Sequence, residues 1–336
     1  MAIEFQVLGR PGRDNALWVR VDSGQSITRL LFDCGDGCLS DLSASEVQAT
    51  DHLFFSHLHM DHIGGFDAFF RRTFNRDTQP NSLWGPPETS AILHHRFQGF
   101  WWNLNGGQPG TWRVHDIHED RVARYRYELS ESFAKQHADG TAGQGSVILD
   151  DRDFTIQAIR LEHRGPSLGY LVREKPKANI QIERLATLGL RPGPWMQALK
   201  SATAPSMIEI DGASFDLAEL RRDLLVETSG DSIAYLTDFL LDEATADRLV
   251  AWLRGCRTVV CEAQYRHLHL DLALRNHHTT TTLVSQLTAR AGVERLILFH
   301  LSDRYRSEEW LEMLEESRVH FPATSFPPHW NLESCA

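Results

Sequence analysis

A short apolar run is followed by the residues Ser56-His57-Leu58-His59-Met60-Asp61-His62-Ile63-Gly64-Gly65. Residues two apart in an extended loop point the same way, so His57 and His59 can converge on one metal ion. If a helix begins near Asp61, its carboxylate and the imidazole of His62 can turn towards a second metal. Imidazole and carboxylate ligands suit zinc best, and manganese and iron also accept them. The spacing therefore predicts a centre for two divalent metal ions, with zinc as the expected ion.

Three further candidate ligands stand where predicted strands end. His163 follows the β-type run 154–161, Asp238 closes the run 233–237, and His300 closes the run 296–299. A polar residue at the end of a buried strand is common, so each position alone indicates little. Together the three residues complete a two-metal shell at the same edges of the predicted sheets.

The pattern around the metal motif predicts two similar halves. Strand-like runs separated by turn signals fill residues 3–32, and a helix-like face at 39–47 precedes the apolar strand 51–55. A second β-rich stretch at 146–173 again leads into alternating strands and helices. This order predicts an α/β fold in which two sheets pack together and helices cover one outer face of each.

Two stretches do not fit this scheme, and we interpret them as insertions into a single domain that spans residues 1–336. Residues 92–118 are rich in Trp and Gly and include Trp101, Trp102 and Trp112. Residues 174–215 are rich in Pro, Lys and Arg and show little periodicity. The second insertion is expected to project as an arm.

The composition favours a soluble protein of a reducing compartment. Five cysteines are spread over 336 residues, an odd number that argues against a disulfide framework. The first residues lack a signal-peptide pattern and no run approaches about 18 apolar residues, so we expect a cytoplasmic protein with no membrane partner. The net charge of −11 argues against a uniformly basic nucleic-acid face but leaves room for a local one.

Several motifs together resemble those of the metallo-β-lactamase superfamily, and in particular its ribonuclease Z branch. Residues 57–62 match the family's His-x-His-x-Asp-His, and residues 299–305 contain its His-x-Ser-x-Arg-Tyr. Residues 32–37 resemble its Asp-x-Gly-(Glu/Asp)-Gly turn, while 260–263 and 276–279 resemble its Glu-Ala and Gly-His-Ser-Thr segments. The resemblance implies a four-layer α-β-β-α sandwich of two similar halves with a projecting arm, and a homodimer.

The same resemblance implies an endoribonuclease that cleaves the 3′ trailer from precursor tRNA with a hydroxide that bridges two metal ions. It assigns the ligands as follows: His57, His59 and His163 hold one metal, Asp61, His62 and His300 hold the other, and Asp238 bridges them.

The resemblance also implies roles in proton transfer. Asp61 orients or deprotonates the nucleophile. Glu262 pairs with His277, and the carboxylate keeps this imidazole protonated so that it donates to the leaving 3′ oxygen. The adjacent His278 competes for the same role, although the register of the motif favours His277.

A basic arm is the candidate RNA-binding element of the sequence. Residues 188–195, followed by Leu199 and Lys200, resemble the Gly-Pro segment of the arm with which ribonuclease Z grips precursor tRNA. Residues 171–204 contain six basic and two acidic side chains, a local excess that suits phosphate contacts. The candidate substrate-binding residues are Lys175, Lys177, Arg191, Lys200 and Arg304.

Departures from the family pattern keep a second substrate class open. The first loop is shorter than usual, and Gly64-Gly65-Phe66 replaces the usual Ser-Gly-Leu. The alternative is a hydrolase of the same fold that acts on a small phosphodiester, a lactone or a sulfate ester.

A serine hydrolase is a weaker alternative. Residues 165–169 match Gly-x-Ser-x-Gly, and Asp238 and His300 follow in the order of an α/β-hydrolase triad. However, residues 168–172 read as a strand where the nucleophile elbow needs a helix. This interpretation also leaves residues 57–62 without a function.

Overall fold

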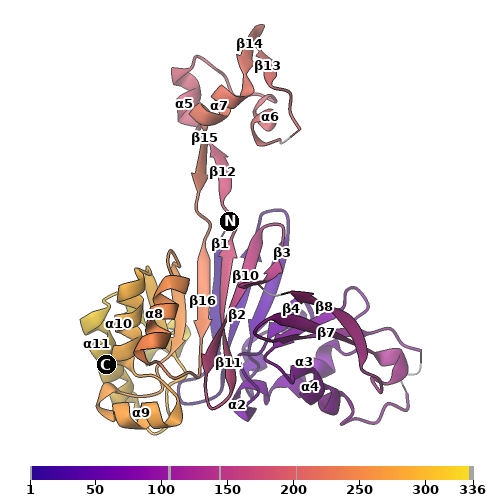
Figure 1. Ribbon diagram of the computed structural model, residues 1–336, viewed down its shortest axis with the longest axis vertical. Helices are drawn as coiled ribbons and strands as arrows, with labels where there is room; N and C mark the ends of the chain where they lie inside the picture. The colour runs from indigo at the N-terminus through magenta and orange to yellow at the C-terminus, as the bar shows by residue number, and fades with distance from the viewer. Residues whose placement is uncertain (1, 105–106, 144, 202, 333–336) are drawn as a thin grey trace. The chain divides into compact units, whose positions relative to one another are not determined.

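The computed structural model describes residues 2–104, 107–143, 145–201 and 203–332. It divides the chain into two compact units, one made of Met1–Arg173 with Asp231–Ala336 and the other of Glu174–Gly230 (Figure 1). The first unit contains both large sheets and every predicted metal ligand.

The first sheet is mixed and follows the chain order. Strands β1 to β3 are antiparallel, β3 to β6 are parallel, and β6 to β8 are again antiparallel. The strands are β1 (Ala2–Gly9), β2 (Asn15–Asp22), β3 (Ile27–Phe32), β4 (His52–Phe54), β5 (Asn81–Gly85), β6 (Thr111–Ile117), β7 (Arg121–Glu128) and β8 (His137–Gly143).

The second sheet repeats this design with a crossover. Its strands run in the order β19-β18-β17-β16-β11-β10-β9, parallel from β16 to β19 and antiparallel between β11 and β16. They are β9 (Val147–Asp150), β10 (Phe154–Glu162), β11 (Pro166–Glu174), β16 (Ser232–Leu236), β17 (Thr258–Glu262), β18 (Arg295–Phe299) and β19 (Thr324–Ser325). Because Ser167 is buried inside β11, it is not at a strand-to-helix elbow, and this excludes the serine hydrolase alternative.

Helices flank each half of this unit (Figure 1). Side chains of the first four helices pack with the first sheet in one cluster, and those of the last four join the large core around the second sheet. The helices are α1 (Ala44–Gln48), α2 (Met60–Ile63), α3 (Phe66–Thr73), α4 (Thr89–Phe97), α8 (Glu243–Trp252), α9 (Leu270–Asn276), α10 (Thr281–Ala291) and α11 (Ser307–His320).

Aromatic side chains join the two sheets. Phe32 stacks on Phe54 with ring centroids 5.0 Å apart, and Phe54 stacks on Trp84 at 5.9 Å. From the second sheet, Tyr170 contacts Phe32 at 5.5 Å and Tyr235 contacts it at 5.8 Å. These large buried rings hold the facing strands β3 and β16 at a fixed separation.

The second unit has its own small core. Strand β12 (Lys177–Ile180) pairs with β15 (Leu225–Thr228), so the segment predicted as the arm 174–215 continues to Gly230 in the structure. A hairpin of β13 (Met207–Ile210) and β14 (Ala213–Asp216) lies between helices in sequence. The helices are α5 (Ile182–Thr187), α6 (Met196–Lys200) and α7 (Leu217–Leu224), and the core residues are Leu185, Leu190, Leu199, Ile210, Leu217, Leu220 and Leu224.

The Trp-rich stretch 92–118 is in part regular structure. Its start belongs to α4, and its end forms β6 between β5 and β7, where Trp112 is fully buried. Residues 98–110 connect the two elements. No helix in the described part of the chain is long and apolar enough to cross a membrane.

Candidate metal centre

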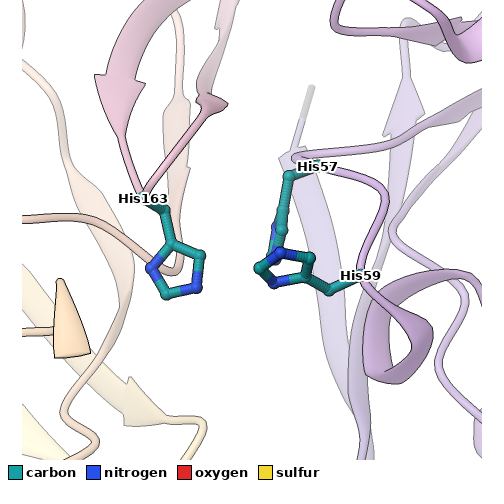
Figure 2. Close-up of side chains that lie close together, drawn as sticks. All are labelled: His57, His59 and His163. Atoms are coloured by element: carbon teal, nitrogen blue, oxygen red, sulfur yellow. The ribbon is translucent and has the colours of Figure 1, made fainter.

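The first three predicted ligands come from two loops at one edge of the sheets. His57 and His59 follow β4, and His163 follows β10. Figure 2 shows the three imidazoles turned towards one another, with centroids 4.5 Å apart for His57 and His59 and 5.2 Å for His57 and His163. One nitrogen of each ring lies within 4.8 Å of those of the other two, a spacing at which the three can share one cation.

A second group lies beside the first. Asp61 and His62 belong to α2, Asp238 follows β16, and His300 follows β18. One ligand atom from each of these four residues lies within 4.8 Å of the others. Parallel strands β16 and β18 end at the same edge of their sheet, which explains why residues far apart in sequence meet here.

The carboxylate of Asp238 lies between the two groups. Its Oδ2 is 3.8 Å from Nε2 of His57 and 3.5 Å from Nε2 of His163. Its Oδ1 is 3.4 Å from Nε2 of His62 and 3.5 Å from Nε2 of His300. Each oxygen therefore faces one group, which is the arrangement that a bridging ligand needs.

The chemistry of these residues fits divalent cations. Within the described part of the chain, the buried Nε2 atoms of His57 and His62 have no hydrogen-bond partner. Burial lowers the pKa of His57 to about 2, so its ring is neutral. Burial alone would raise the pKa of Asp238, but the imidazoles of His300 and His62 outweigh it and hold that pKa well below its usual range. Neutral imidazoles and ionised carboxylates are the forms that bind metals.

Asp33 orients one candidate ligand, a role that the sequence pattern around residues 32–37 did not predict. Its Oδ2 accepts hydrogen bonds from Nδ1 of His62 at 2.8 Å and from the hydroxyl of Tyr235 at 2.9 Å. Its Oδ1 accepts from the backbone N–H of Ser56 at 2.6 Å. Because the Asp33 carboxylate accepts the Nδ1 proton of His62, Nε2 is the nitrogen of that ring that faces the site and that a metal could bind.

His163 is oriented in a similar way. Its Nδ1 donates to the backbone carbonyl of His277 at 2.8 Å, which leaves Nε2 facing Asp238. The tautomer is thus set by a backbone group of the loop that follows α9.

The backbone turns sharply where strands deliver these side chains. Asp33, Asp238 and His300 have φ values of 59°, 48° and 52°, in the left-handed region that non-glycine residues rarely adopt. Such a conformation costs on the order of 1–3 kcal/mol per residue and persists where the surroundings enforce it. The three turns aim their side chains at the same place.

The structure corrects the expected pairing of Glu262 with His277. Nδ1 of His278 donates to Oε2 of Glu262 at 2.9 Å, whereas Nδ1 of His277 accepts from the backbone N–H of Arg164 at 3.2 Å. His277 ends α9 with φ of 56°, and this left-handed residue points its ring away while the next residue enters the site. Burial would lower the pKa of His278, but the carboxylate of Glu262 outweighs it and raises that pKa to about 9.

The five predicted substrate-binding residues lie in different units. Arg304 follows His300 by four positions, and its guanidinium lies over the rings of Tyr265 at 5.8 Å and Tyr305 at 6.0 Å. The other four lie between Glu174 and Gly230 in the second unit: Lys175, Lys177, Arg191 and Lys200.

Comparisons with known proteins agree with this geometry. A ribonuclease Z from Deinococcus radiodurans is 50% identical over 324 residues, which cover 96% of this chain and 97% of that protein. The chain belongs to the ribonuclease Z family. A ribonuclease Z from Geobacillus kaustophilus is 30% identical, over 96% of this chain and 89% of that protein. A family model described as anti-Pycsar protein Apyc1 matches residues 14–158.

Solved structures show the same fold for this ribonuclease Z family member. The metallo-β-lactamase fold protein YhfI from Bacillus subtilis superposes with a TM-score of 0.57 at 12% identity, covering 97% of this chain and 96% of that one. The short form of human tRNase Z superposes with a TM-score of 0.51 at 18% identity, and the match covers 91% of this chain and 94% of that one. The expected metallo-β-lactamase fold and the resemblance to ribonuclease Z are therefore confirmed.

The role of Asp33 can be tested through metal affinity. Asp33→Asn removes the charge that fixes His62, so metal affinity is expected to fall by about 10- to 100-fold. Competition against a zinc-binding dye measures it. Asp36→Asn, which changes an exposed carboxylate three residues further on, is the matched control and should bind as tightly as the wild type. Equal affinity in both variants would show that Asp33 does not position His62.

Proposed function

We propose that this chain is a metal-dependent endoribonuclease that removes the 3′ trailer of precursor tRNA. Its relatives of 50% and 30% identity are named ribonuclease Z. The single observation that carries the chemistry is the position of Asp238, whose two oxygens each face a different group of ligands. We infer that one cation is held by the imidazoles of His57, His59 and His163, another by Asp61, His62 and His300, and that Asp238 bridges them.

Two divalent cations bound there would lower the pKa of a water molecule and offset charge on a phosphoryl oxygen. The chain's own residues would complete the reaction. Asp61 is about half exposed, with Oδ2 3.4 Å from Nε2 of His62 and 3.6 Å from Nε2 of His300. From this position it would orient the attacking water and accept its proton.

The pair of His278 and Glu262 is suited to protonate the leaving group. Glu262 is fully buried, and its Oε1 accepts from the backbone N–H of Phe239 at 3.0 Å, so the carboxylate is fixed in place. It holds Nδ1 of His278, which leaves Nε2 of that ring as the donor to the 3′ oxygen. His278 thus takes the role that the sequence motif favoured for His277.

Zinc remains the expected metal, with manganese or iron as alternatives, because the donor set is imidazole and carboxylate. We also expect the protein to act in the cytoplasm. Four cysteines, Cys34, Cys38, Cys256 and Cys261, are buried free thiols, which is compatible with a reducing compartment.

The second unit would grip the RNA through a local patch. Lys177, Arg191 and Lys200 have no ion pair with any described residue, and their ammonium and guanidinium groups remain available for phosphates. The Gly-Pro loop is held by Trp195, whose Nε1 donates to the carbonyl of Arg191 at 3.1 Å. Residues 174–230 contain seven basic and eight acidic side chains, so the unit as a whole is not basic and the RNA would have to be held by individual side chains such as these three.

The proton-donor assignment is tested by neighbouring variants. His278→Asn is expected to slow single-turnover cleavage of a precursor tRNA by about 100- to 10,000-fold, the usual contribution of a general acid. His277→Asn is the matched control, because asparagine tolerates the left-handed conformation and keeps the carbonyl that His163 needs. A slow His277→Asn with a fully active His278→Asn would contradict the assignment. Cleavage of a small aryl phosphodiester but not of precursor tRNA by the wild type would favour the small-substrate alternative.

The RNA-binding patch is tested by salt dependence. Replacing Lys177, Arg191 and Lys200 with alanine removes three proposed phosphate contacts. The slope of the logarithm of the RNA-binding constant against the logarithm of the salt concentration should therefore become less negative by about 2 to 3. Arg222→Ala is the control, since that guanidinium is 3.4 Å from Asp223 and 3.7 Å from Glu219. An unchanged slope in the triple variant would count against the patch.

A further inference from the structure

A cavity of about 350 Å³ opens between the two sheets of the first unit. Its walls on the side of the first sheet include Pro87, which follows β5, and Ile117 at the end of β6. Its walls on the side of the second sheet include Ala158 of β10 and Leu168 of β11. Ile117, Ala158 and Leu168 are each 9% exposed or less and belong to the large core. Because core side chains form its walls, the cavity is preformed.

The cavity lies at the same sheet edge as the candidate metal ligands. Strands β4, β5 and β6 are parallel neighbours, so the residues that follow them emerge together: His57 after β4, Pro87 after β5 and His118 after β6. Neighbouring strands are about 4.8 Å apart, which places the wall at β6 about 10 Å from the strand that delivers His57. The backbone N–H of Leu168 donates to the carbonyl of Ser56 at 2.8 Å and so ties another wall to the ligand loop.

The lining of the cavity is mostly apolar, and its charged groups are exposed. The guanidinium of Arg160 lies 3.6 Å from the carboxylate of Glu119, and these side chains are 56% and 85% exposed. An exposed ion pair of this kind is weak, so Arg160 can exchange Glu119 for another acceptor. An α-helix with its side chains is about 10 to 12 Å wide, too wide for this volume. A single planar ring system fits it.

The order of the strands indicates which side of the scissile bond reaches the cavity. Neighbouring strands of the second sheet run in the order β17-β16-β11-β10. Glu262, which holds His278, ends β17, Asp238 follows β16, and the cavity lies against β11 and β10. Along this edge, Glu262 is therefore on one side of Asp238 and the cavity is on the other.

The proposed chemistry gives this order a direction. Attack of water on the phosphorus breaks the P–O3′ bond, the 3′ oxygen takes a proton from Nε2 of His278, and the phosphate stays on the 5′ oxygen of the trailer. The last ribose of the tRNA is therefore held on the side of Glu262 and His278. The trailer continues through its 5′ oxygen towards β10 and the cavity.

We propose that this cavity binds the base of the first nucleotide of the RNA trailer, a proposal that rests on the proposed ribonuclease activity and adds a subsite to it. Unpaired RNA bases can turn out of a stack and enter such pockets. One extended nucleotide, from its phosphorus to the far edge of its base, spans a distance of the order of 10 Å that separates the cavity from the strand of His57. Apolar walls hold the base by burial and accept any of the four bases. Arg160 contacts the phosphate that follows.

The first test needs no variant of the protein. The wild type is offered precursor tRNAs in which one trailer nucleotide is abasic, and kcat/KM for cleavage is measured. Removing the first trailer base should lower kcat/KM by about 10- to 100-fold, the usual contribution of one buried base. Removing the fourth trailer base should change nothing. An abasic first nucleotide that leaves kcat/KM unchanged would overturn the proposal.

The second test fills the cavity. Ala158→Leu should lower kcat/KM for the intact precursor by about 10-fold or more, because the base no longer fits. The two changes should not add, so on the precursor with an abasic first trailer nucleotide this variant should be no slower than the wild type. Ala291→Leu is the matched control, since Ala291 on α10 is 8% exposed and Ala158 is 9% exposed, and it should be as active as the wild type. Circular dichroism confirms that each variant is folded.

Two outcomes of the second test would overturn the base-binding proposal alone: an Ala158→Leu variant that is fully active on the intact precursor, or one that is equally impaired on both precursors. A wild type that cleaves a small aryl phosphodiester but no precursor tRNA would instead contradict the proposed ribonuclease activity, and the base-binding proposal with it.

Discussion

One carboxylate, that of Asp238, faces imidazoles from both halves of the first unit. The first half supplies His57 and His62, and the second supplies His163 and His300. Among the described residues the buried Nε2 atoms of His57 and His62 have no hydrogen-bond partner, and a cation between them and the carboxylate would supply one. Because these side chains come from both sheets, the separation of the sheets must be held within a narrow range. The contacts that join the sheets meet this requirement.

Buried aromatic and polar contacts hold that separation. Phe32 at the end of β3 meets Tyr170 and Tyr235 of the second sheet. The hydroxyl of Tyr170 donates to the carbonyl of Phe55 at 2.6 Å, two residues before the first ligand. The hydroxyl of Tyr235 donates to Asp33, the residue that orients His62. The same side chains that fill the core thus fix the positions of the ligands.

Local sequence patterns predicted most of the side chains that the structure brings together in the candidate centre. The spacing of His57, His59, Asp61 and His62 is readable because all four lie in one loop and one helical turn. The positions of His163, Asp238 and His300 follow from strand ends, and the structure brings all three to the same edge. What sequence did not predict depends on contacts between distant residues: Asp33 and Tyr235 are 202 positions apart. The choice between His277 and His278 depended on a single left-handed residue at the end of α9. The extent of the arm depended on the pairing of β12 with β15, which joins residues that are far apart in the sequence.

The metal content of the purified protein tests the central claim most directly. If Asp238 bridges two cations, elemental analysis of the wild type after metal loading should give about two ions per chain, and Asp238→Ala should retain fewer, because each site loses an oxygen ligand at once. Asp36→Ala, which removes an exposed carboxylate, should retain both. A wild type that binds only one ion, or an Asp238→Ala variant that keeps two with unchanged affinity, would contradict the account.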